Sequence, residues 1–340
     1  MHPNPIVAEA PEKLSICIPT YNRPDALIKT LQVLIPQCEL AGCRIHIVDN
    51  ASTIPVEEIV SRNFGNQREL ITISRNRFNI GGNANLCRCF ELCETEWMWM
   101  LGDDDMVDEN ALKIIQSAIS EADESFCMLN FASNINEKQS SDSIRNFDDL
   151  ARETSKGVYF GNLLFISSSI YRLPPLRGHI MNAYQFAYSC APQLILPFLA
   201  ICDGFSIRNC QEHIVQWMIP EPVEKWNLIF LLLGLGSLSD HPYLRPMNAT
   251  VIRHAVKCFL GKIRRYVKSG ILNLITCPEN ELQFWASAYL RIASNLNMAD
   301  KTALIFLSQL ACFMRLIKPF RNLIRKVLKL DPAIENLART

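Results

Sequence analysis

Short apolar runs alternate with amphipathic segments over the first third of the chain, and this alternation is the strongest constraint on its fold. Each apolar run is four to six residues long and ends near a polar or glycine-containing turn, as buried strands do. The expected strands are residues 14–18, 44–48, 70–73 and 97–102, and the expected helices are residues 25–35, 83–93 and 109–122. This order predicts an α/β fold with a mostly parallel sheet flanked by helices.

The polar residues of this region gather where the expected strands end. Thr20 and Tyr21 follow the first strand, Asp49 follows the second, and three consecutive aspartates follow the fourth. In open α/β sheets, ligands bind at the carboxyl ends of the strands. The sequence therefore predicts a ligand site along this edge of the sheet.

The aspartate run, Asp103, Asp104 and Asp105, closes the apolar run 97–102. Three adjacent carboxylates repel one another, so they either spread into solvent or are neutralised by a cation. Mg²⁺ prefers oxygen ligands and is usually held by one or two carboxylates together with substrate phosphates. Taken by itself, the run fits both a metal–phosphate site and a solvated acidic turn that caps the next helix.

The other polar motifs at this edge also have two interpretations each. Asp49 either accepts hydrogen bonds from a nucleobase or ribose, or ends its strand in an Asx turn. Gly81 and Gly82 either let the backbone N–H groups of a helix start approach a pyrophosphate, or form a tight turn. Thr20 and Tyr21 either contact a base or sugar or are ordinary turn residues.

Taken in order, these motifs resemble the nucleotide-sugar-binding half of glycosyltransferase family 2, whose members have the Rossmann-like GT-A fold. The resemblance covers residues 13–125 and rests on the segments PTYNR (19–23), DNAS (49–52), NIGGNAN (79–85) and the aspartate run. The residues it assigns to the donor nucleotide are Pro19, Thr20, Tyr21, Asn22, Asp49, Asn79, Gly82, Asn83 and Asp103. The residues it assigns to a divalent cation, Mg²⁺ or Mn²⁺, are Asp103, Asp104 and Asp105.

The metal motif departs from the family pattern at one position. Many relatives have L-D-x-D-D, whereas this chain has Leu101 and Gly102 before the three aspartates. Either Asp103 and Asp105 form the D-x-D pair, or Asp104 binds the metal in a shifted register. The L-G-D-D-D form resembles a branch that acts on bacterial surface-polysaccharide precursors, including abequosyl-type deoxysugar transferases.

The resemblance implies that a sugar moves, with inversion, from a nucleoside diphosphate to a hydroxyl of a glycan or lipid-linked acceptor. The cation would neutralise the leaving diphosphate, and a carboxylate would deprotonate the acceptor. Relatives often carry this base in a Glu-Asp pair well after the metal motif, and this chain has no such pair there. Asp203 lies at the expected distance, although Asp-Gly favours a turn. Glu212, Asp148 and Asp149 are weaker candidates, so the base stays open.

The composition agrees with a cytoplasmic enzyme. A chain of 340 residues with 49% hydrophobic residues can bury a sizeable core, and its first residues do not have the pattern of a secretory signal. The 13 cysteines lie mostly in apolar runs, as buried thiols do in a reducing compartment. Cys87, Cys89 and Cys93 lie close together in the sequence, in a spacing that favours core packing over zinc binding.

Charge is distributed unevenly along the chain. Residues 1–240 carry 18 basic and 29 acidic side chains, whereas residues 241–340 carry 16 basic and 5 acidic ones. Over residues 313–330, basic and apolar side chains alternate at helical spacing. Such a segment either binds an anionic membrane, here the inner face of the plasma membrane, or forms the solvated face of a packed helix. Binding to nucleic acid is not expected, because no recognition motif is present.

These patterns suggest a division of the chain. We expect a GT-A domain over residues 1–225, with a donor half (1–130) and an acceptor half (131–225), and a helical basic region over 226–340. The polar stretch 134–155 predicts a mobile loop over the acceptor site. The apolar run 226–238 is shorter than a membrane span and predicts a buried or interfacial helix.

Two other functions compete with glycosyl transfer. A catalytically inactive nucleotide-binding or scaffold protein would account for the missing Glu-Asp pair. A metal-dependent nucleotidyltransferase also uses carboxylates on an α/β sheet, but it typically has a glycine-rich loop near its N-terminus, and the segment PTYNRP contains no glycine.

Overall fold

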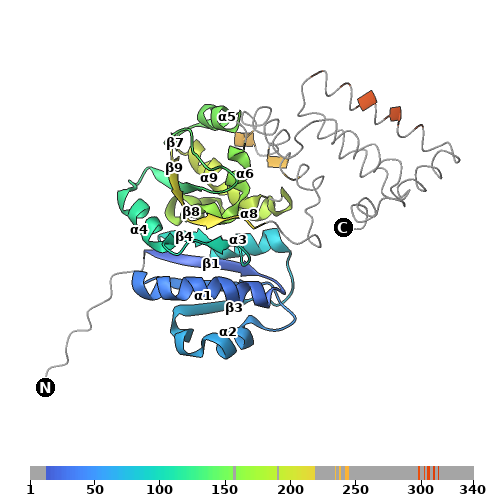
Figure 1. The fold of residues 1–340 in the computed structure, drawn as a ribbon. Helices are drawn as coiled ribbons and strands as arrows, with labels where there is room; N and C mark the ends of the chain where they lie inside the picture. Colours follow the sequence, from blue (N-terminus) through green and yellow to red (C-terminus); the bar gives the residue numbers. More distant parts are fainter. Residues whose placement is uncertain are drawn as a thin grey trace. The chain divides into compact units, whose positions relative to one another are not determined.

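The computed structural model describes residues 13–155, 158–189 and 191–218, together with isolated residues between 234 and 313. The described residues form an eight-stranded sheet with the strand order β3-β2-β1-β4-β8-β6-β9-β7 (Figure 1). Its strands are β1 (Leu14–Thr20), β2 (Arg44–Asp49), β3 (Ile71–Arg75), β4 (Trp97–Met100), β6 (Phe126–Ala132), β7 (Ser143–Ile144), β8 (Ser169–Arg172) and β9 (Ser206–His213). The predicted α/β class is confirmed.

Most of the sheet is parallel. β3, β2, β1 and β4 pair in parallel, and so do β6 and β9, whereas β8 runs antiparallel to both β4 and β6. The chain moves from β1 outward to β2 and β3, and then returns to β4 on the other side of β1. The carboxyl ends of β1 and β4 therefore flank a topological switch point, where open α/β sheets bind their ligands. A separate antiparallel pair joins β5 (Met106–Val107) to β10 (Val215–Gln216).

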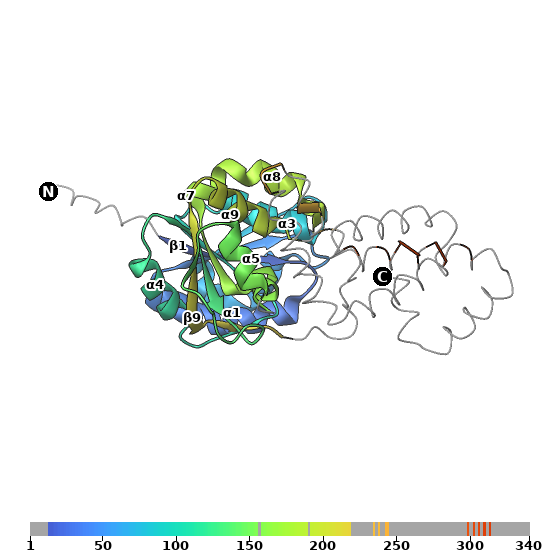
Figure 2. The ribbon, with the colours of Figure 1, turned by 90° about the horizontal axis from the view of Figure 1, so that it is seen from above.

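Helices cover both faces of the sheet. In all, the described residues form the helices α1 (Pro24–Ala41), α2 (Val56–Phe64), α3 (Gly82–Leu92), α4 (Ala111–Glu121), α5 (Phe147–Ser155), α6 (Tyr159–Leu164), α7 (Leu173–Leu176), α8 (Ile180–Gln185) and α9 (Pro192–Cys202), of which α5 belongs to a second compact unit. In the view from above, α1 and α4 lie on one side of the strands, and α3, α8 and α9 lie on the other (Figure 2). The expected helices 25–35, 83–93 and 109–122 thus correspond to α1, α3 and α4.

Helix α1 begins where the sequence predicts and ends later. Pro24 occupies its first turn, where its missing N–H is no loss, and Asp25 is an acid in the same turn. The helix continues through Pro36 to Ala41, because its buried apolar side chains recur at helical spacing as far as Cys38. It ends at Gly42, whose φ of 64° is the left-handed conformation that glycine adopts without strain.

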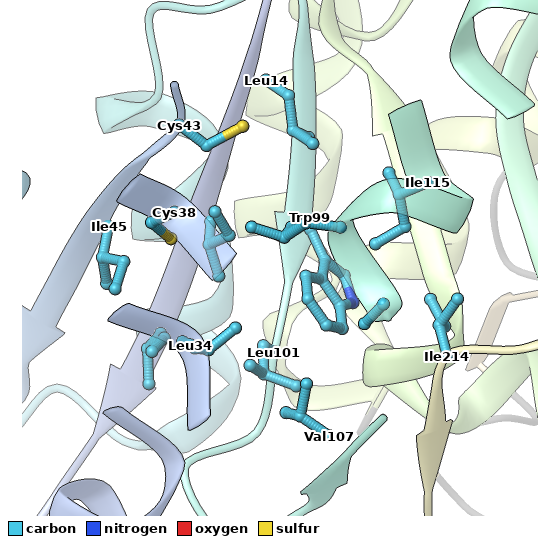
Figure 3. Close-up of a cluster of buried hydrophobic side chains, with 14 of the residues drawn as sticks. Leu14, Leu34, Cys38, Cys43, Ile45, Trp99, Leu101, Val107, Ile115 and Ile214 are labelled. Carbon is cyan, nitrogen blue, oxygen red and sulfur yellow. The ribbon is translucent and has the colours of Figure 1, made fainter. Parts of the chain in front are cut away.

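Trp99 is the largest fully buried side chain of the core. Figure 3 shows its indole among Leu101, Val107, Ile115 and Ile214. Its Nε1 donates a hydrogen bond of 2.8 Å to the backbone carbonyl of Ser167, so its polar atom is satisfied as well. This packing fixes β4, and with it the aspartate run that begins three residues after the end of the strand.

The prediction of a mobile loop over residues 134–155 is wrong for much of that stretch. It contains the short strand β7 and the helix α5, on which Leu150 is buried. The acidic residues that suggested a solvated loop lie largely in α5, where Asp148 and Asp149 occupy the first turn and favour a helix start.

The chain divides into two compact units. One comprises Met1–Asn146, Asn162–Ala187 and Pro192–Met218, and the other comprises Phe147–Gly161, Tyr188–Ala191 and Ile219–Thr340. The expected boundary at residue 225, the apolar run 226–238 and the basic segment 313–330 lie outside the described residues, apart from single positions within them. Among the helices that the structure describes, none combines the length and apolar character needed to cross a membrane.

Candidate functional site

The loops that follow β1, β2 and β4 meet at the carboxyl edge of the sheet. The Thr20 Oγ1 at the end of β1 donates a hydrogen bond of 2.6 Å to Oδ2 of Asp103, just beyond β4. The backbone N–H of Asn50, just beyond β2, donates to the carbonyl of Thr20 at 2.9 Å. The structure therefore brings together the predicted site residues Thr20 and Asp103 and the segment DNAS, which come from three separate motifs.

Asp103 is buried and held from several sides. Its carboxylate accepts hydrogen bonds from Thr20 and, at 3.2 Å, from Nη1 of Arg23, and its backbone carbonyl accepts one from Thr30. Burial raises the pKa of Asp103 to about 6, although the Thr20 hydrogen bond and the Arg23 charge oppose this rise. Burial thus disfavours the charged carboxylate, and additional positive charge at this point would stabilise it.

Asp104 is exposed and shares the same guanidinium. Nη1 of Arg23 lies 2.6 Å from Oδ2 of Asp104 and also contacts Asp103. One cation thus faces two carboxylates from adjacent positions of the run. Arg23 is part of the PTYNR segment but is not among the predicted site residues.

Asp105 faces a different set of partners. Ser167 Oγ donates a hydrogen bond of 2.5 Å to its Oδ2, and the backbone N–H of Met218 also hydrogen bonds its carboxylate. Burial raises the pKa of Asp105 to about 7, against the effect of the Ser167 hydrogen bond. Sequence reasoning missed Ser167, because it lies 62 residues away from Asp105 and belongs to no motif.

The donor set fits a divalent cation that is shared with a substrate. In the part of the chain that the structure describes, no three acidic, histidine or cysteine side chains are arranged to hold a metal ion by themselves. Mg²⁺ and Mn²⁺ need no such protein cage, because they accept one or two carboxylates together with phosphate oxygens and water. Asp103 and Asp104, which already face a common cation in Arg23, offer those carboxylates.

Asp49 is fully buried at the end of β2, and its carboxylate is occupied by the protein. Oδ1 accepts the backbone N–H of Ser52 at 2.8 Å, and Oδ2 is paired with Arg75 and faces the N–H of Val56 at 3.5 Å. In this arrangement Asp49 closes the turn after its strand, which is one of its two predicted roles. Arg75 was not foreseen, because it comes from the end of β3.

Two left-handed residues shape the loops after β1 and β2. Asn22 has a φ of 54° and Ala51 a φ of 64°. The loops are joined by reciprocal hydrogen bonds, since the Asn22 N–H donates to Ser52 Oγ at 3.0 Å and the Thr53 N–H donates to Asn22 Oδ1 at 2.7 Å. Tyr21, which directly precedes Asn22, is 42% exposed, so its ring is available at the surface.

The loop before α3 is held by side-chain amides. Asn79 Oδ1 accepts hydrogen bonds of 2.8 Å from both Asn50 Nδ2 and the Gly81 N–H. Gly81, with a φ of 86°, is the residue before the helix, and Gly82 and Asn83 are its first residues. The free N–H groups of a helix start therefore lie beside the loop after β2, where an anion is favoured.

Asp203 lies at the opposite edge of the sheet. It directly follows α9, just before β9, and β9 begins beside the amino end of β6, which runs parallel to β9 and β4. Its carboxylate pairs with Nε2 of His179 at 2.7 Å, and Gly204 beside it has a φ of 93°, so the turn interpretation holds. This geometry argues against Asp203 as the general base. Asp148 and Asp149 belong to α5 in the other unit, and Glu212 is exposed near the end of β9.

Comparisons with known proteins agree with this fold. Residues 15–173 match the model of glycosyl transferase family 2. Abequosyltransferase RfbV of Salmonella typhimurium strain LT2 is 34% identical over 116 residues, which are 34% of this chain and 35% of that protein. The match thus spans about a third of the length of this relative.

Solved structures of glycosyltransferases share the fold at low sequence identity. S. aureus TarS (residues 1–349) superposes with a TM-score of 0.59 and 12% identity, covering 93% of this chain and 91% of that one, and it has also been solved with UDP and with UDP-GlcNAc. The mannosyltransferase PcManGT from Pyrobaculum calidifontis, solved with GDP-Man and Mn²⁺, gives 0.52 and 14%, covering 97% and 87%. The predicted GT-A type of fold is confirmed.

Proposed function

We propose that this chain, in which residues 15–173 form a glycosyl transferase family 2 domain, moves a sugar from a nucleoside diphosphate to an acceptor hydroxyl. The observation that carries the proposal is the contact between Thr20 and Asp103 at the switch point of the sheet. It joins the two loops between which an open α/β sheet binds nucleotides, in a domain whose family acts on nucleotide sugars.

Within this proposal, Asp103 and Asp104 bind the divalent cation of the donor diphosphate. When bound, Mg²⁺ or Mn²⁺ supplies positive charge that stabilises the leaving diphosphate. Arg23 faces both carboxylates and is one-third exposed, so its guanidinium can turn toward the diphosphate when a cation neutralises them. The helix start at Gly82 and Asn83 adds N–H groups for the same anion.

The nucleoside end lies along the loops after β1 and β2. Pro19 lies near the end of β1, Tyr21 and Asn22 belong to the loop that follows it, and Asn79 borders the loop after β2. The Asp49 carboxylate is already bound to Ser52 and Arg75. Asp49 therefore either only shapes the loop, or binds the nucleoside after Arg75 has moved away. Arg75 is 39% exposed, so such an exchange needs only a side-chain movement.

We infer the sugar and acceptor from the sequence relative rather than from the site. The match to an abequosyltransferase supports a deoxysugar donor and an acceptor in surface-polysaccharide assembly. The basic segment 313–330 supports peripheral contact with an anionic membrane at the cytoplasmic face, where a lipid-linked acceptor would lie. Salt-sensitive co-sedimentation with anionic vesicles, lost when Arg321, Arg325 and Lys326 are replaced by glutamate, is the expected result.

A panel of nucleotide sugars tests the function. The purified chain is incubated with UDP-, GDP-, CDP- and dTDP-linked sugars, Mn²⁺ and a glycan acceptor extract, and released nucleoside diphosphate is measured. Release with one donor class supports glycosyl transfer. Tight nucleotide binding without turnover would point to the inactive-scaffold alternative, and release of pyrophosphate from nucleoside triphosphates would point to a nucleotidyltransferase.

A further inference from the structure

Position 102 is where this chain departs from the L-D-x-D-D pattern, and the structure gives the departure a physical cause. A Cβ atom on Gly102 would lie 2.5 Å from Oδ2 of Asp105 and 3.4 Å from Oγ of Ser167. The Asp105 carboxylate thus occupies the space that a side chain at position 102 would need. Gly102 has no left-handed backbone angle, so the space rather than the backbone conformation favours glycine here, and a larger residue would need the Asp105 carboxylate to move.

The space is closed by Ser167, which contacts both residues. Its Oγ accepts the backbone N–H of Gly102 at 2.8 Å and donates to Asp105 at 2.5 Å, and its carbonyl accepts the Trp99 indole N–H at 2.8 Å. Ser167 is fully buried, and its bond with the Trp99 indole is buried too, whereas its bonds with Gly102 and Asp105 are partly buried. Ser167, which precedes β8, therefore hydrogen bonds both β4 and the residues that follow it.

Asp105 also reaches a third segment. Met218 lies two residues after β10, and its backbone N–H donates a hydrogen bond to the Asp105 carboxylate. Strand β10 in turn pairs with β5, which begins directly after Asp105. Asp103 and Asp104 instead share Nη1 of Arg23. Two of the three aspartates thus face the Arg23 guanidinium, whereas Asp105 faces Ser167 and Met218.

We propose that Asp105 is an anchor rather than a metal ligand, and that Gly102 and Ser167 are positioning residues that fold its carboxylate away from the cation site. This inference rests on the proposed function, since it assigns the donor cation to Asp103 and Asp104 alone. Gly102 and Ser167 set which carboxylates of the run face the donor diphosphate. The anchor also ties the β5–β10 pair to the rim of the site.

The decisive comparison is between Asp104→Asn and Asp105→Asn. Binding is measured by calorimetry with Mn²⁺ and whichever of UDP, GDP, CDP or dTDP binds the wild-type chain. Asparagine keeps the shape of aspartate and an oxygen for Ser167, so Asp105→Asn should bind within about threefold of wild type. Asp104→Asn should lose roughly tenfold or more, the scale of one interaction with a charged group. Equal losses in both variants would make Asp105 a ligand and overturn the proposal.

A double-mutant cycle tests the role of Gly102 independently of any ligand. Gly102→Ala should lower the denaturation midpoint more in the wild-type background than in Asp105→Ala, because the clash exists only when the Asp105 carboxylate is present. Additive effects of the two substitutions would contradict the proposed contact. The same cycle in Mn²⁺-dependent nucleotide binding should show coupling of the same sign.

The two proposals fail in different ways. If no nucleoside diphosphate binds the wild-type chain with Mn²⁺, the proposed function is wrong, while the coupling in the denaturation cycle still decides whether Gly102 and Asp105 share the space described. If the wild type binds and Gly102→Ala binds equally well, the positioning role is wrong and the proposed function stands.

Discussion

Thr20 and Asp103, 83 residues apart in the sequence, share a buried hydrogen bond of 2.6 Å that joins the ends of β1 and β4. The bond satisfies a carboxylate that burial would otherwise leave with Arg23 as its remaining side-chain partner. It also links the two strand ends at the switch point of the sheet, through two residues that separate sequence motifs each predicted to be part of the site.

Removing this hydroxyl should destabilise the fold. Thr20→Val keeps the shape but leaves the buried carboxylate without one donor, which should lower the free energy of unfolding by about 1–3 kcal/mol. Thr20→Ser, which retains the hydroxyl, is the matched control and should lose much less. Urea denaturation measures both, and equal losses in the two variants would show that the hydroxyl contributes little.

Substitutions of Ala51 should change stability according to how well the new residue adopts the left-handed backbone conformation. An alanine with φ of 64° stores strain of about 1 kcal/mol, which glycine avoids at some entropic cost. Ala51→Gly should therefore leave stability unchanged or slightly raised, whereas the β-branched Ala51→Val should lower it by roughly 1–3 kcal/mol. Thermal unfolding of both variants checks this, and a stable Ala51→Val would contradict the strained turn.

Asp203 should be dispensable for catalysis. Its carboxylate pairs with His179 at the edge of the sheet opposite the aspartate run, so Asp203→Asn should retain donor turnover within about threefold, while the loss of a surface ion pair changes stability by less than about 1 kcal/mol. Steady-state kinetics with the donor identified by the panel measures this. A loss of two or more orders of magnitude in kcat would restore Asp203 as the general base.

Protonation of His46 on β2 should lower the free energy of unfolding as the pH drops below 6.5. Burial lowers the pKa of His46 below its ordinary value of 6.5, with Glu94 opposing the shift. Because the unfolded chain then binds the proton more readily than the folded one, unfolding free energy is highest above pH 6.5 and falls as the pH drops through the folded pKa. His46→Gln should flatten this part of the profile. A profile unchanged by the substitution would exclude His46 as its cause.

Much of the donor half could be predicted because its signals are local. Each strand is a short apolar run closed by its own polar turn, and Thr20, Asp49 and Asp103 each follow such a run directly. In a parallel sheet, those strand ends meet at one edge whatever the details of packing. The alternation of strands and helices was therefore enough to bring the three motifs together.

The remaining contacts depend on chain segments that are distant in sequence. Ser167 and Met218 reach Asp105 only because β8 and β10 are placed against β4 and β5, and no local pattern around residues 167 or 218 signals this. Asp203 remains a prediction from spacing along the chain, and its position before β9, at the amino end of that strand, argues against a catalytic role. The helix in the polar stretch 134–155 was missed because acidic residues suit both a solvated loop and a helix start.

Metal dependence tests the central claim most directly. Donor turnover by the wild-type chain should disappear in EDTA and return with Mn²⁺, and Asp104→Asn should lower kcat/KM by about 100-fold or more, since even residues that only orient metal ligands cost 10–100-fold. Asp203→Asn, measured in parallel, should behave as wild type. Turnover that persists undiminished both in EDTA and in Asp104→Asn would contradict a cation held by the aspartate run.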